Sequence, residues 1–128
     1  MAVENNDGLR QAGAYMTAIR ELRDRYQAAD RLLIDAIRDE IRDMVLSVET
    51  RSGWIPLGSH PDDHPAGEFL VLLSFGGPSV RIHGDIPLDP DAIRIQGQDW
   101  GTAWEDLRID DADRMVLVWF AQMVGLED

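Results

Sequence analysis

Apolar residues recur every three or four positions over residues 9–48, the first third of the chain. This is the spacing of an amphipathic helix, because residues three and four apart share one face. One continuous helix over this segment would be about 60 Å long, which is too long for a compact domain of this size. We therefore predict a helix pair or a bend near residues 28–30, with Asp30 as the N-cap of the second helix. The apolar positions are Tyr15, Ile19, Leu22, Tyr26, Ala29, Leu33, Ile37, Ile41, Met44 and Val48.

The middle of the chain changes to an alternating pattern. Alternation of apolar and polar residues predicts strands over residues 46–51, 79–86 and 92–99. A nearly continuous apolar run over residues 68–75 predicts a central strand that is covered on both faces. Two glycines and a proline at residues 76–78 predict a tight turn between strands.

The last segment has the pattern of a helix. Asp110, Asp111 and Asp113 precede an apolar run over residues 115–124, and acid is favourable at a helix N-terminus. The predicted fold class is therefore α+β, with a long or bent N-terminal helix or helix pair, a three- to four-stranded antiparallel meander and a C-terminal helix. We expect the whole chain, residues 1–128, to form a single domain in which residues 1–8 are disordered.

The chain carries a large excess of acid. It has 24 Asp and Glu against 12 Arg and no Lys, which gives a net charge of -12 and a pI near 4.4. This charge repels nucleic acid and anionic membranes and speeds encounter with basic surfaces. Two interpretations stay open at this point. The acid is either spread over solvated faces for solubility, or it forms a recognition surface for a nucleic-acid-binding protein.

Other features of the sequence restrict the cellular compartment in which the protein is expected. The chain contains no cysteine, which excludes disulfides, thiolate metal sites and a cysteine nucleophile. Its first residues lack the basic and apolar regions of a secretory signal, and the longest apolar run, residues 115–121, is far shorter than the roughly 20 residues of a membrane span. We expect a cytoplasmic location in a host cell.

Histidines occur in two settings, of which the first is a polar loop. His60, Asp62, Asp63 and His64 are all residue types that bind metals, and they lie within five positions. Prolines in the loop prevent a helical arrangement of these ligands, and no second cluster completes the set. We predict a solvated loop and no metal site.

The second histidine, His83, lies on the polar face of a predicted strand. If this strand pairs with the next as a hairpin, one polar patch results. A histidine beside an arginine can act as a base, so a small enzyme that uses His83 and Arg81 is one alternative. No catalytic motif supplies a nucleophile, so we predict no catalytic residue and no cofactor. The patch consists of Arg81, His83, Asp85, Arg94, Gln96 and Gln98.

The most distinctive local segment is residues 99–106. Trp100 and Trp104 lie four residues apart, with carboxylates on both sides. If exposed, the two indoles would be aromatic anchors with an acidic rim, suited to an arginine-rich partner. The alternative is that both fill the end of the sheet against the C-terminal helix.

Three strings in the last three-fifths of the chain resemble a known family. LSVETRSGW (residues 46–54), LLSFGGPSVRIHGDI (72–86) and QDWGTAW (98–104) are similar, in that order, to LSVEVRSGW, LLSTGGPAVRI and YQDWGTPW. Those strings are usual in a family of small proteins carried by phages, plasmids and integrated elements, which end in an aromatic-rich helix. The resemblance covers residues 46–124 and leaves out the N-terminal helix. The chain departs from the usual residues at Thr50 (usually Val), Phe75 (Thr), Gly97 (an aromatic) and Ala103 (Pro).

The resemblance implies a biological setting and no specific chemistry. The family has no established general activity, so no functional residue is carried over to this chain. Small acidic proteins of mobile elements are often inhibitors of host defence, including anti-CRISPR and anti-restriction proteins. Such inhibitors commonly mimic the charge of nucleic acid or block a basic channel.

We therefore expect a mobile-element-encoded, anti-CRISPR-like inhibitor that binds a basic, nucleic-acid-handling surface of a host effector, and not an enzyme. The alternative is a self-associating accessory protein, with a homodimer formed through the nearly heptad spacing of the N-terminal helix. The first expected contact surface, named the tryptophan–acid surface, is Asp99, Trp100, Trp104, Glu105, Asp106, Asp110, Asp111 and Asp113. The second, named the helical acid surface, is Asp35, Asp39, Glu40 and Asp43.

Overall fold

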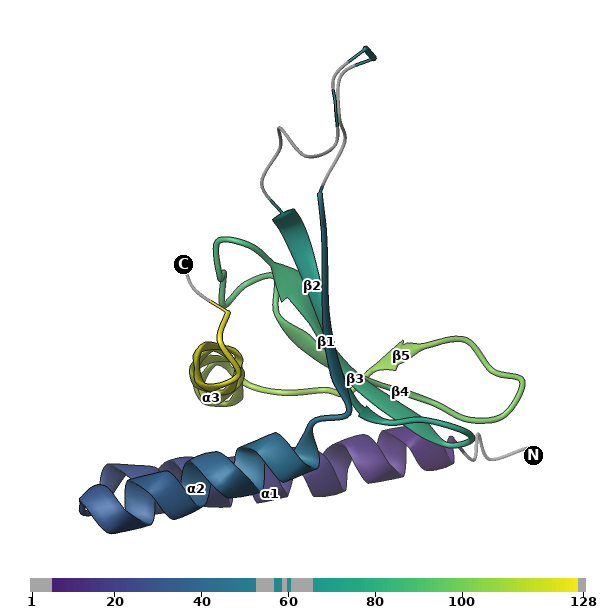
Figure 1. Cartoon of the computed structure of the whole chain (residues 1–128). Coiled ribbons are helices and arrows are strands. Elements are labelled where there is room, and N and C mark those ends of the chain that lie inside the picture. The colour runs from purple at the N-terminus through teal and green to yellow at the C-terminus, as the bar shows by residue number, and fades with distance from the viewer. Residues whose placement is uncertain (1–5, 53–56, 59, 61–65, 127–128) are drawn as a thin grey trace.

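The chain folds as three helices and a five-stranded antiparallel sheet, in a computed structural model that describes residues 6–52, 57–58, 60 and 66–126. The strands follow one another across the sheet in chain order, which confirms the predicted α+β class and meander. Helix α3 lies on one side of the sheet, and α1 and α2 run side by side along its lower end (Figure 1). The elements are α1 (Asp7–Gln27), α2 (Arg31–Met44), β1 (Ser47–Ser52), β2 (Ala66–Ser74), β3 (Ser79–Asp85), β4 (Arg94–Gln98), β5 (Glu105–Asp106) and α3 (Asp111–Met123).

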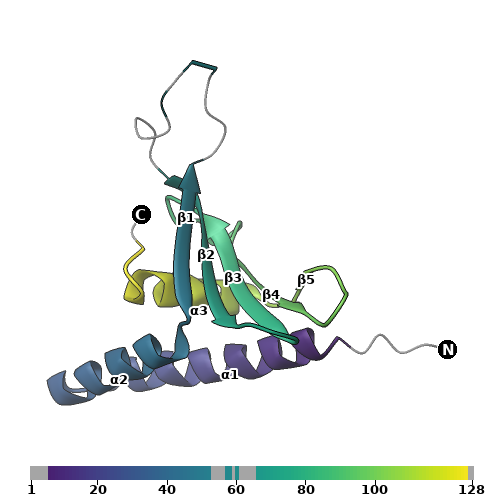
Figure 2. The same ribbon diagram turned by 45° about the vertical axis from the view of Figure 1, so that its right-hand side comes forward.

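The predicted break between two N-terminal helices is confirmed. Asp30 is the N-cap of α2, and its carboxylate accepts a hydrogen bond of 3.0 Å from the backbone N–H of Leu33. The chain reverses there, so that α2 returns beside α1 (Figure 2). Most of the predicted apolar stripe faces the core, as at Ile19 and Ile37, but Leu33 is 53% exposed and Val48 lies on β1 with its side chain 40% exposed.

Helix α1 begins earlier than the sequence predicts. Asn6 is its N-cap, and the side-chain oxygen of Asn6 accepts a hydrogen bond of 3.1 Å from the N–H of Leu9. Residues 6–8, which we expected to be disordered, therefore form the cap and first turn of the helix. Residues 1–5 lie outside the described part of the chain.

The first turn of α1 packs on β4 with no side chain between the two backbones. A Cβ added to Gly97 would lie 2.2 Å from the carbonyl carbon of Gly8, and a Cβ added to Gly8 would lie 2.2 Å from the backbone nitrogen of Gln98. Only hydrogen fits at either position. An aromatic side chain at residue 97 would therefore displace α1.

The pleat of the strands separates an inner face from an open face. Val71, Ile82 and Ile95 lie in register across β2, β3 and β4 on the inner face, and all three are fully buried. The apolar positions of the alternating pattern over residues 79–86 and 92–99 therefore lie on the buried face, as Ile82 and Ile95 show. The inner face packs with α1 and α3 into one core, whose largest fully buried side chains are Phe69, Phe120, Met16, Ile19, Ile37, Ile82, Ile93, Ile95, Leu117, Val71 and Val80.

The expectation that the central strand is covered on both faces is wrong. Leu70 and Leu72 of β2 point to the open face and are half-buried. Their cross-strand neighbours on β3 are His83 and Arg81. On this face, long polar side chains therefore flank the two leucines, and the predicted second layer of secondary structure does not cover them. A continuous apolar run does not distinguish this arrangement from a strand between two layers.

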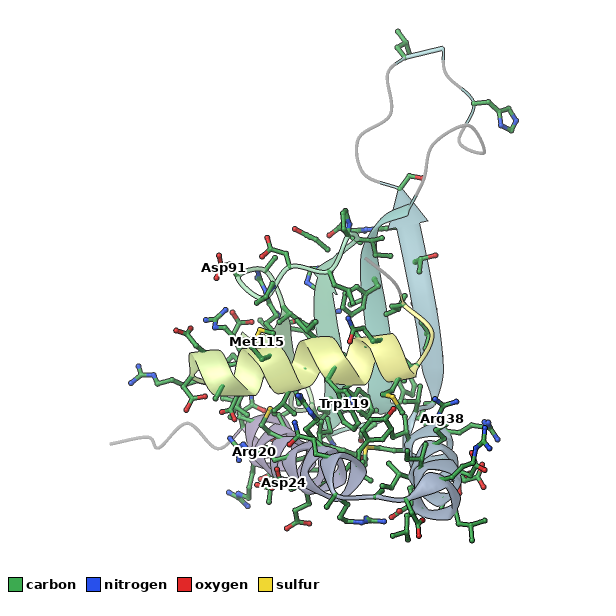
Figure 3. All side chains as sticks on the ribbon, turned by 90° about the vertical axis from the view of Figure 1, so that its left-hand side faces the viewer. Arg20, Asp24, Arg38, Asp91, Met115 and Trp119 are labelled. Carbon is green, nitrogen blue, oxygen red and sulfur yellow. The ribbon has the colours of Figure 1, made fainter. Side chains whose placement is uncertain are left out.

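Helix α3 crosses the inner face of the sheet. Asp110 is its N-cap and accepts a hydrogen bond of 2.8 Å from the N–H of Asp113, so acid does mark the helix start as predicted. Trp119 lies on the side of α3 that faces the N-terminal helices (Figure 3). There its ring centroid is 5.5 Å from that of Tyr26, and the guanidinium of Arg23 lies 5.7 Å from it.

Two further features complete the fold. Strand β5 consists only of Glu105 and Asp106, and so it is too short to show an alternating pattern in the sequence. It pairs with Gln96 and Gly97 of β4. Among the described residues, no helix combines the length and apolar character needed to cross a membrane.

The close packing of α1 on β4 predicts the effect of adding one methyl group. We expect Gly97→Ala to destabilise the fold by about 1–3 kcal/mol, because the new Cβ overlaps the backbone of α1. Gly13→Ala is the matched control, since a Cβ at Gly13 has nothing within 4 Å. That change improves helix propensity and should stabilise the protein by up to about 1 kcal/mol. Urea unfolding of both variants checks the pair, and equal free energies of unfolding would contradict the proposed contact.

Candidate binding surfaces

Trp100 is held at the surface by a hydrogen-bonded turn. Its side chain is 82% exposed. Its backbone N–H donates to the Asp99 carboxylate at 2.7 Å, and the Asp99 N–H donates to the hydroxyl of Thr102 at 2.9 Å. Gly101 follows with φ +80°, which closes the turn without strain. The indole is therefore exposed on a backbone that is locally fixed.

A second aromatic side chain lies near the same turn. Phe75 is 80% exposed and begins the turn between β2 and β3, one residue beyond the end of β2. Trp100 packs over this turn, because a Cβ added to Gly77 would lie 2.6 Å from the indole. The sequence pattern placed Phe75 at the end of a buried strand. Its exposure thus adds an apolar residue that the sequence-based list of contact residues lacks.

Carboxylates are frequent in the sequence around Trp100. Residues 99–111 contain five of them and one arginine, Arg108. Glu105 and Asp111 are exposed, as is Asp110 at the α3 N-cap. Asp106 is also exposed and accepts a hydrogen bond of 2.7 Å from the side-chain amide of Gln96. This segment therefore has a strongly negative local charge.

Trp104 takes a different role from Trp100. It is half-buried on the open face, where the guanidinium of Arg81 lies 4.0 Å from its ring centroid. Burial, followed by the charge of Arg51, lowers the pKa of Arg81, although Asp106 opposes this shift. Neither tryptophan fills the end of the sheet against α3, so that alternative is wrong. Trp104 packs on the open face, and Trp100 is the exposed indole of the pair.

Asp113 does not belong to the exposed acid. It is 8% exposed and forms a bidentate ion pair with Arg20 of α1, with contacts of 2.6 and 2.7 Å. Figure 3 shows Arg20 below the N-terminal half of α3. The hydrogen bonds from Arg20 hold the pKa of Asp113 below its ordinary value. Its expected role in partner binding is therefore wrong, because the carboxylate joins α3 to α1.

The helical acid surface is mixed in charge. Asp35, Asp39, Glu40 and Asp43 are all exposed on α2, but the same helix carries three arginines. Two of the carboxylates are paired, Glu40 with Arg25 and Asp39 with Arg42. The hydrogen bond from Arg25 lowers the pKa of Glu40. These four residues lie together as predicted, yet the nearby arginines offset most of their negative charge.

The open face of the sheet carries a linked set of polar side chains. Arg51 of β1 donates from Nε to Glu68 of β2 at 2.8 Å, and the other oxygen of Glu68 lies 3.1 Å from Nε2 of His83. Arg51, and then His83, hold the pKa of Glu68 below its ordinary value through these hydrogen bonds. Sequence reasoning missed Glu68, because its role depends on the pairing register of three strands.

The predicted polar patch on β3 and β4 is present. Arg81 pairs with Gln96 and His83 with Arg94 across the two strands, and Nε of Arg81 donates to Gln96 at 2.8 Å. Each of the three strings that carry the resemblance supplies residues to this open face: Arg51 from the first, Arg81 and His83 from the second, and Trp104 from the third.

The open face also forms a shallow trough. Its lining within the described residues contains no serine or cysteine. The trough thus offers charged and apolar contacts but no activated nucleophile of those two types. The lining residues are Glu49, Thr50, Arg51, Glu68, Phe69, Leu70, Arg81 and His83.

The histidine loop lies mostly outside the described part of the chain. Residues 61–65, which include Asp62, Asp63 and His64, are not described, and neither are residues 53–56 and 59. In the described ranges, no group of three or more His, Cys, Asp or Glu residues is arranged to hold a metal ion.

Comparison with known proteins gives no relative. No protein-family model, no curated protein and no solved structure matches the chain. The structure is that of an α+β domain with an open-faced, five-stranded antiparallel sheet and a tryptophan-bearing turn, which contains Asp99, near one edge.

The Arg20–Asp113 ion pair predicts a pH-dependent contribution to stability. We expect Asp113→Asn to lower the free energy of unfolding by about 1.5–3 kcal/mol at neutral pH, because hydrogen bonds to a charged, buried group are lost. The pKa of Asp113 is lowered on folding, so this contribution is complete above the ordinary value of 3.8 and is lost as pH falls through the folded-state pKa.

Denaturant unfolding between acidic and neutral pH measures this effect. Asp39→Asn is the matched control, because the Asp39–Arg42 pair is exposed and such pairs contribute little. The difference between Asp113→Asn and the unmodified protein should shrink toward acid. If the difference in free energy of unfolding between Asp113→Asn and the unmodified protein stayed constant across the pH range, the charge of Asp113 would not be the cause of the stabilisation.

Proposed function

We propose that the protein is a mobile-element-encoded, anti-CRISPR-like inhibitor that binds a basic, nucleic-acid-handling surface of a host effector. It acts by stoichiometric binding and not by catalysis. The observation that carries this proposal is Trp100, whose indole is 82% exposed on a fixed turn that contains the Asp99 carboxylate and is followed by four exposed carboxylates along the chain. The contact residues are the exposed members of the tryptophan–acid surface together with Phe75.

A fixed, exposed tryptophan favours binding for thermodynamic reasons. Large aromatic side chains dominate the energetics of interfaces, since they bury much area with few rotatable bonds. The turn around Trp100 is already ordered by the hydrogen bonds of Asp99 and Thr102, so binding loses little further backbone entropy there. Phe75 is a second exposed aromatic side chain, in the turn over which Trp100 packs.

The surrounding acid selects the kind of partner. Glu105, Asp106, Asp110 and Asp111 attract arginine and lysine side chains, which also interact favourably with an indole face. Surfaces that hold DNA or RNA are rich in these side chains, because they neutralise phosphates. The net charge of -12 makes direct binding of nucleic acid by this chain unfavourable, so the partner is the protein that handles it.

The tryptophan–acid surface is preferred to the helical acid surface on local charge. The segment of residues 99–111 has five carboxylates and one arginine, whereas α2 has four carboxylates and three arginines. Two of the α2 carboxylates are engaged in ion pairs within the chain, whereas among the exposed carboxylates of residues 99–111 only Asp111 has such a partner in the described residues, Arg114 at 4.0 Å. A basic partner therefore gains more from the first surface.

The proposal predicts separable effects of changes on the two surfaces. Trp100→Ala and Glu105→Arg should each leave the fold intact, because both side chains are exposed. We expect Trp100→Ala to weaken partner binding by about 2 kcal/mol or more, roughly thirtyfold. The measurements are pull-down and titration against a panel of purified CRISPR effector complexes and restriction enzymes, and plasmid transformation into hosts with active CRISPR interference.

Matched controls lie on α2. Leu32→Ala removes a side chain that is 81% exposed, and Asp35→Arg reverses an exposed carboxylate. Both should bind and inhibit as the unmodified protein does. The proposal fails if no member of the panel is bound. The choice of surface fails if the α2 variants lose inhibition while Trp100→Ala retains it.

A separate prediction concerns His83, on which the enzymatic alternative depends. We expect His83→Ala to keep full inhibitory effect, since His83 lies on the open face and no serine or cysteine lines the trough there. The readout is the same transformation assay at equal protein level, with thermal unfolding to show that the variant folds. Loss of inhibition in a folded His83→Ala protein would favour catalysis.

A further inference from the structure

Strand β1 forms an open edge of the sheet. It pairs with β2 on one side, and no other described strand pairs with it. Figure 3 shows β1 at the margin of the sheet with no helix or strand beyond it. As far as the described residues show, its outer backbone N–H and C=O groups are left for another chain to pair with.

The edge lacks two of the features that usually prevent pairing, proline and lysine. Over Ser47–Ser52 there is no proline and no lysine, and the only irregularity in its pairing with β2 falls between Arg51 and Ser52. The side chain of Val48 is 40% exposed and that of Leu46 is 59% exposed. The two charged residues of the strand, Glu49 and Arg51, have opposite signs.

Symmetry restricts how two copies of this edge can pair. Two identical antiparallel strands are related by a two-fold axis perpendicular to the sheet, so opposed residues must lie on the same face. Because successive side chains point to opposite faces, the axis must lie at the level of one residue, midway between the two copies of that residue. It cannot lie at a level between two successive residues of a strand. The candidate centres are therefore single residues of β1.

Only one centre matches the charges. An axis at Thr50 places Glu49 opposite Arg51 of the second copy, and Arg51 opposite Glu49 of the second copy. Thr50 then faces Thr50, a favourable cross-strand pair. An axis at Glu49 or at Arg51 opposes two like charges, and an axis at Val48 leaves Glu49 opposite Ser47. Glu49 makes no ion pair or hydrogen bond within the described part of its own chain, so it is free for this contact.

We propose that the protein forms a homodimer by antiparallel pairing of β1 with β1 of a second copy, about a two-fold axis at Thr50. The two sheets join into one continuous sheet. Arg51 then lies between Glu68 of its own chain, 2.8 Å away, and Glu49 of the second copy. This replaces the expected homodimer through the N-terminal helix, whose apolar stripe is used within the chain, as buried Ile19 and Leu22 show.

The dimer leaves the tryptophan–acid surface free. Strand β1 is at one edge of the sheet, and β5, beside that surface, is at the other. The two copies would therefore carry one such surface at each end of the joined sheet. Two linked sites raise the apparent affinity for a partner that offers two matching surfaces. The dimer itself does not depend on the proposed function.

A single introduced thiol tests the axis directly. The chain has no cysteine, so Thr50→Cys carries one thiol. Directly opposed residues of antiparallel strands have Cα atoms about 4.5–5.5 Å apart, a separation that a disulfide spans. We expect Thr50→Cys to form a covalent dimer under mild oxidation. Val48→Cys is the matched control, because the two copies of residue 48 would be roughly 13 Å apart along the strands.

Sedimentation equilibrium tests the proposed pairing of Glu49 with Arg51 between the two copies. The measurement is made at about 0.15 M salt, where the mutual repulsion of two acidic chains is screened. We expect Glu49→Arg to weaken self-association by about tenfold or more, since both cross-strand pairs become repulsive. An equal mixture of Glu49→Arg and Arg51→Glu chains should restore a dimer, because each chain then opposes opposite charges. Circular dichroism shows whether each variant folds.

Three results would overturn the proposal. The unmodified protein could stay monomeric up to about 1 mM. A dimer could form that is indifferent to Glu49→Arg, which would place the interface elsewhere. Val48→Cys could also cross-link as fast as Thr50→Cys. None of these results bears on inhibition of a host effector, which a monomer can also perform, so the failures of the two proposals are distinguishable.

Discussion

The contact between Gly8 and Gly97 is the constraint on which the rest of the structure depends. It brings the backbone of α1 against β4 and thereby closes the inner face of the sheet over Met16 and Ile19. The same contact brings the start of α1 beside the loop after β4, where the N–H of Asp7 donates to the Asp99 carboxylate at 3.3 Å. Asp99 also orders the turn that carries Trp100. The position of the exposed indole thus follows from how closely one helix approaches one strand.

The periodicity of the sequence predicts most of the helices and strands, but it does not predict which faces of the sheet are covered by other elements. The helix break at Asp30, the strands and the inward faces of β3 and β4 all follow from local spacing and capping, which are properties of short segments. The open face of β2 was not predictable in this way. Whether Leu70 and Leu72 lie under a second layer depends on where α1 and α3 pack, and that choice is made by contacts far apart in the sequence.

The candidate surfaces divide in the same way. The acid and the tryptophans were visible in the sequence, but their partners were not. Asp113 was indistinguishable from Asp111 by composition, yet Arg20, 93 positions away, removes it from the surface. Trp104 was indistinguishable from Trp100 until Arg81 was placed against it. Pairing across distant segments decides which charged and aromatic groups remain free, and the sequence specifies it only through the complete fold.

The sheet therefore presents two chemically different edges. At the β1 edge, charges of opposite sign alternate along a strand with an unpaired side, an arrangement that complements itself. At the β5 edge, the strand itself consists of two exposed carboxylates and the turn before it carries an exposed indole, an arrangement that repels a second copy and attracts a basic surface. A net charge of -12 would disfavour any association between copies if it were spread evenly. Because β1 and β5 are the two opposite edges of the sheet, self-association and partner binding can take place without competing.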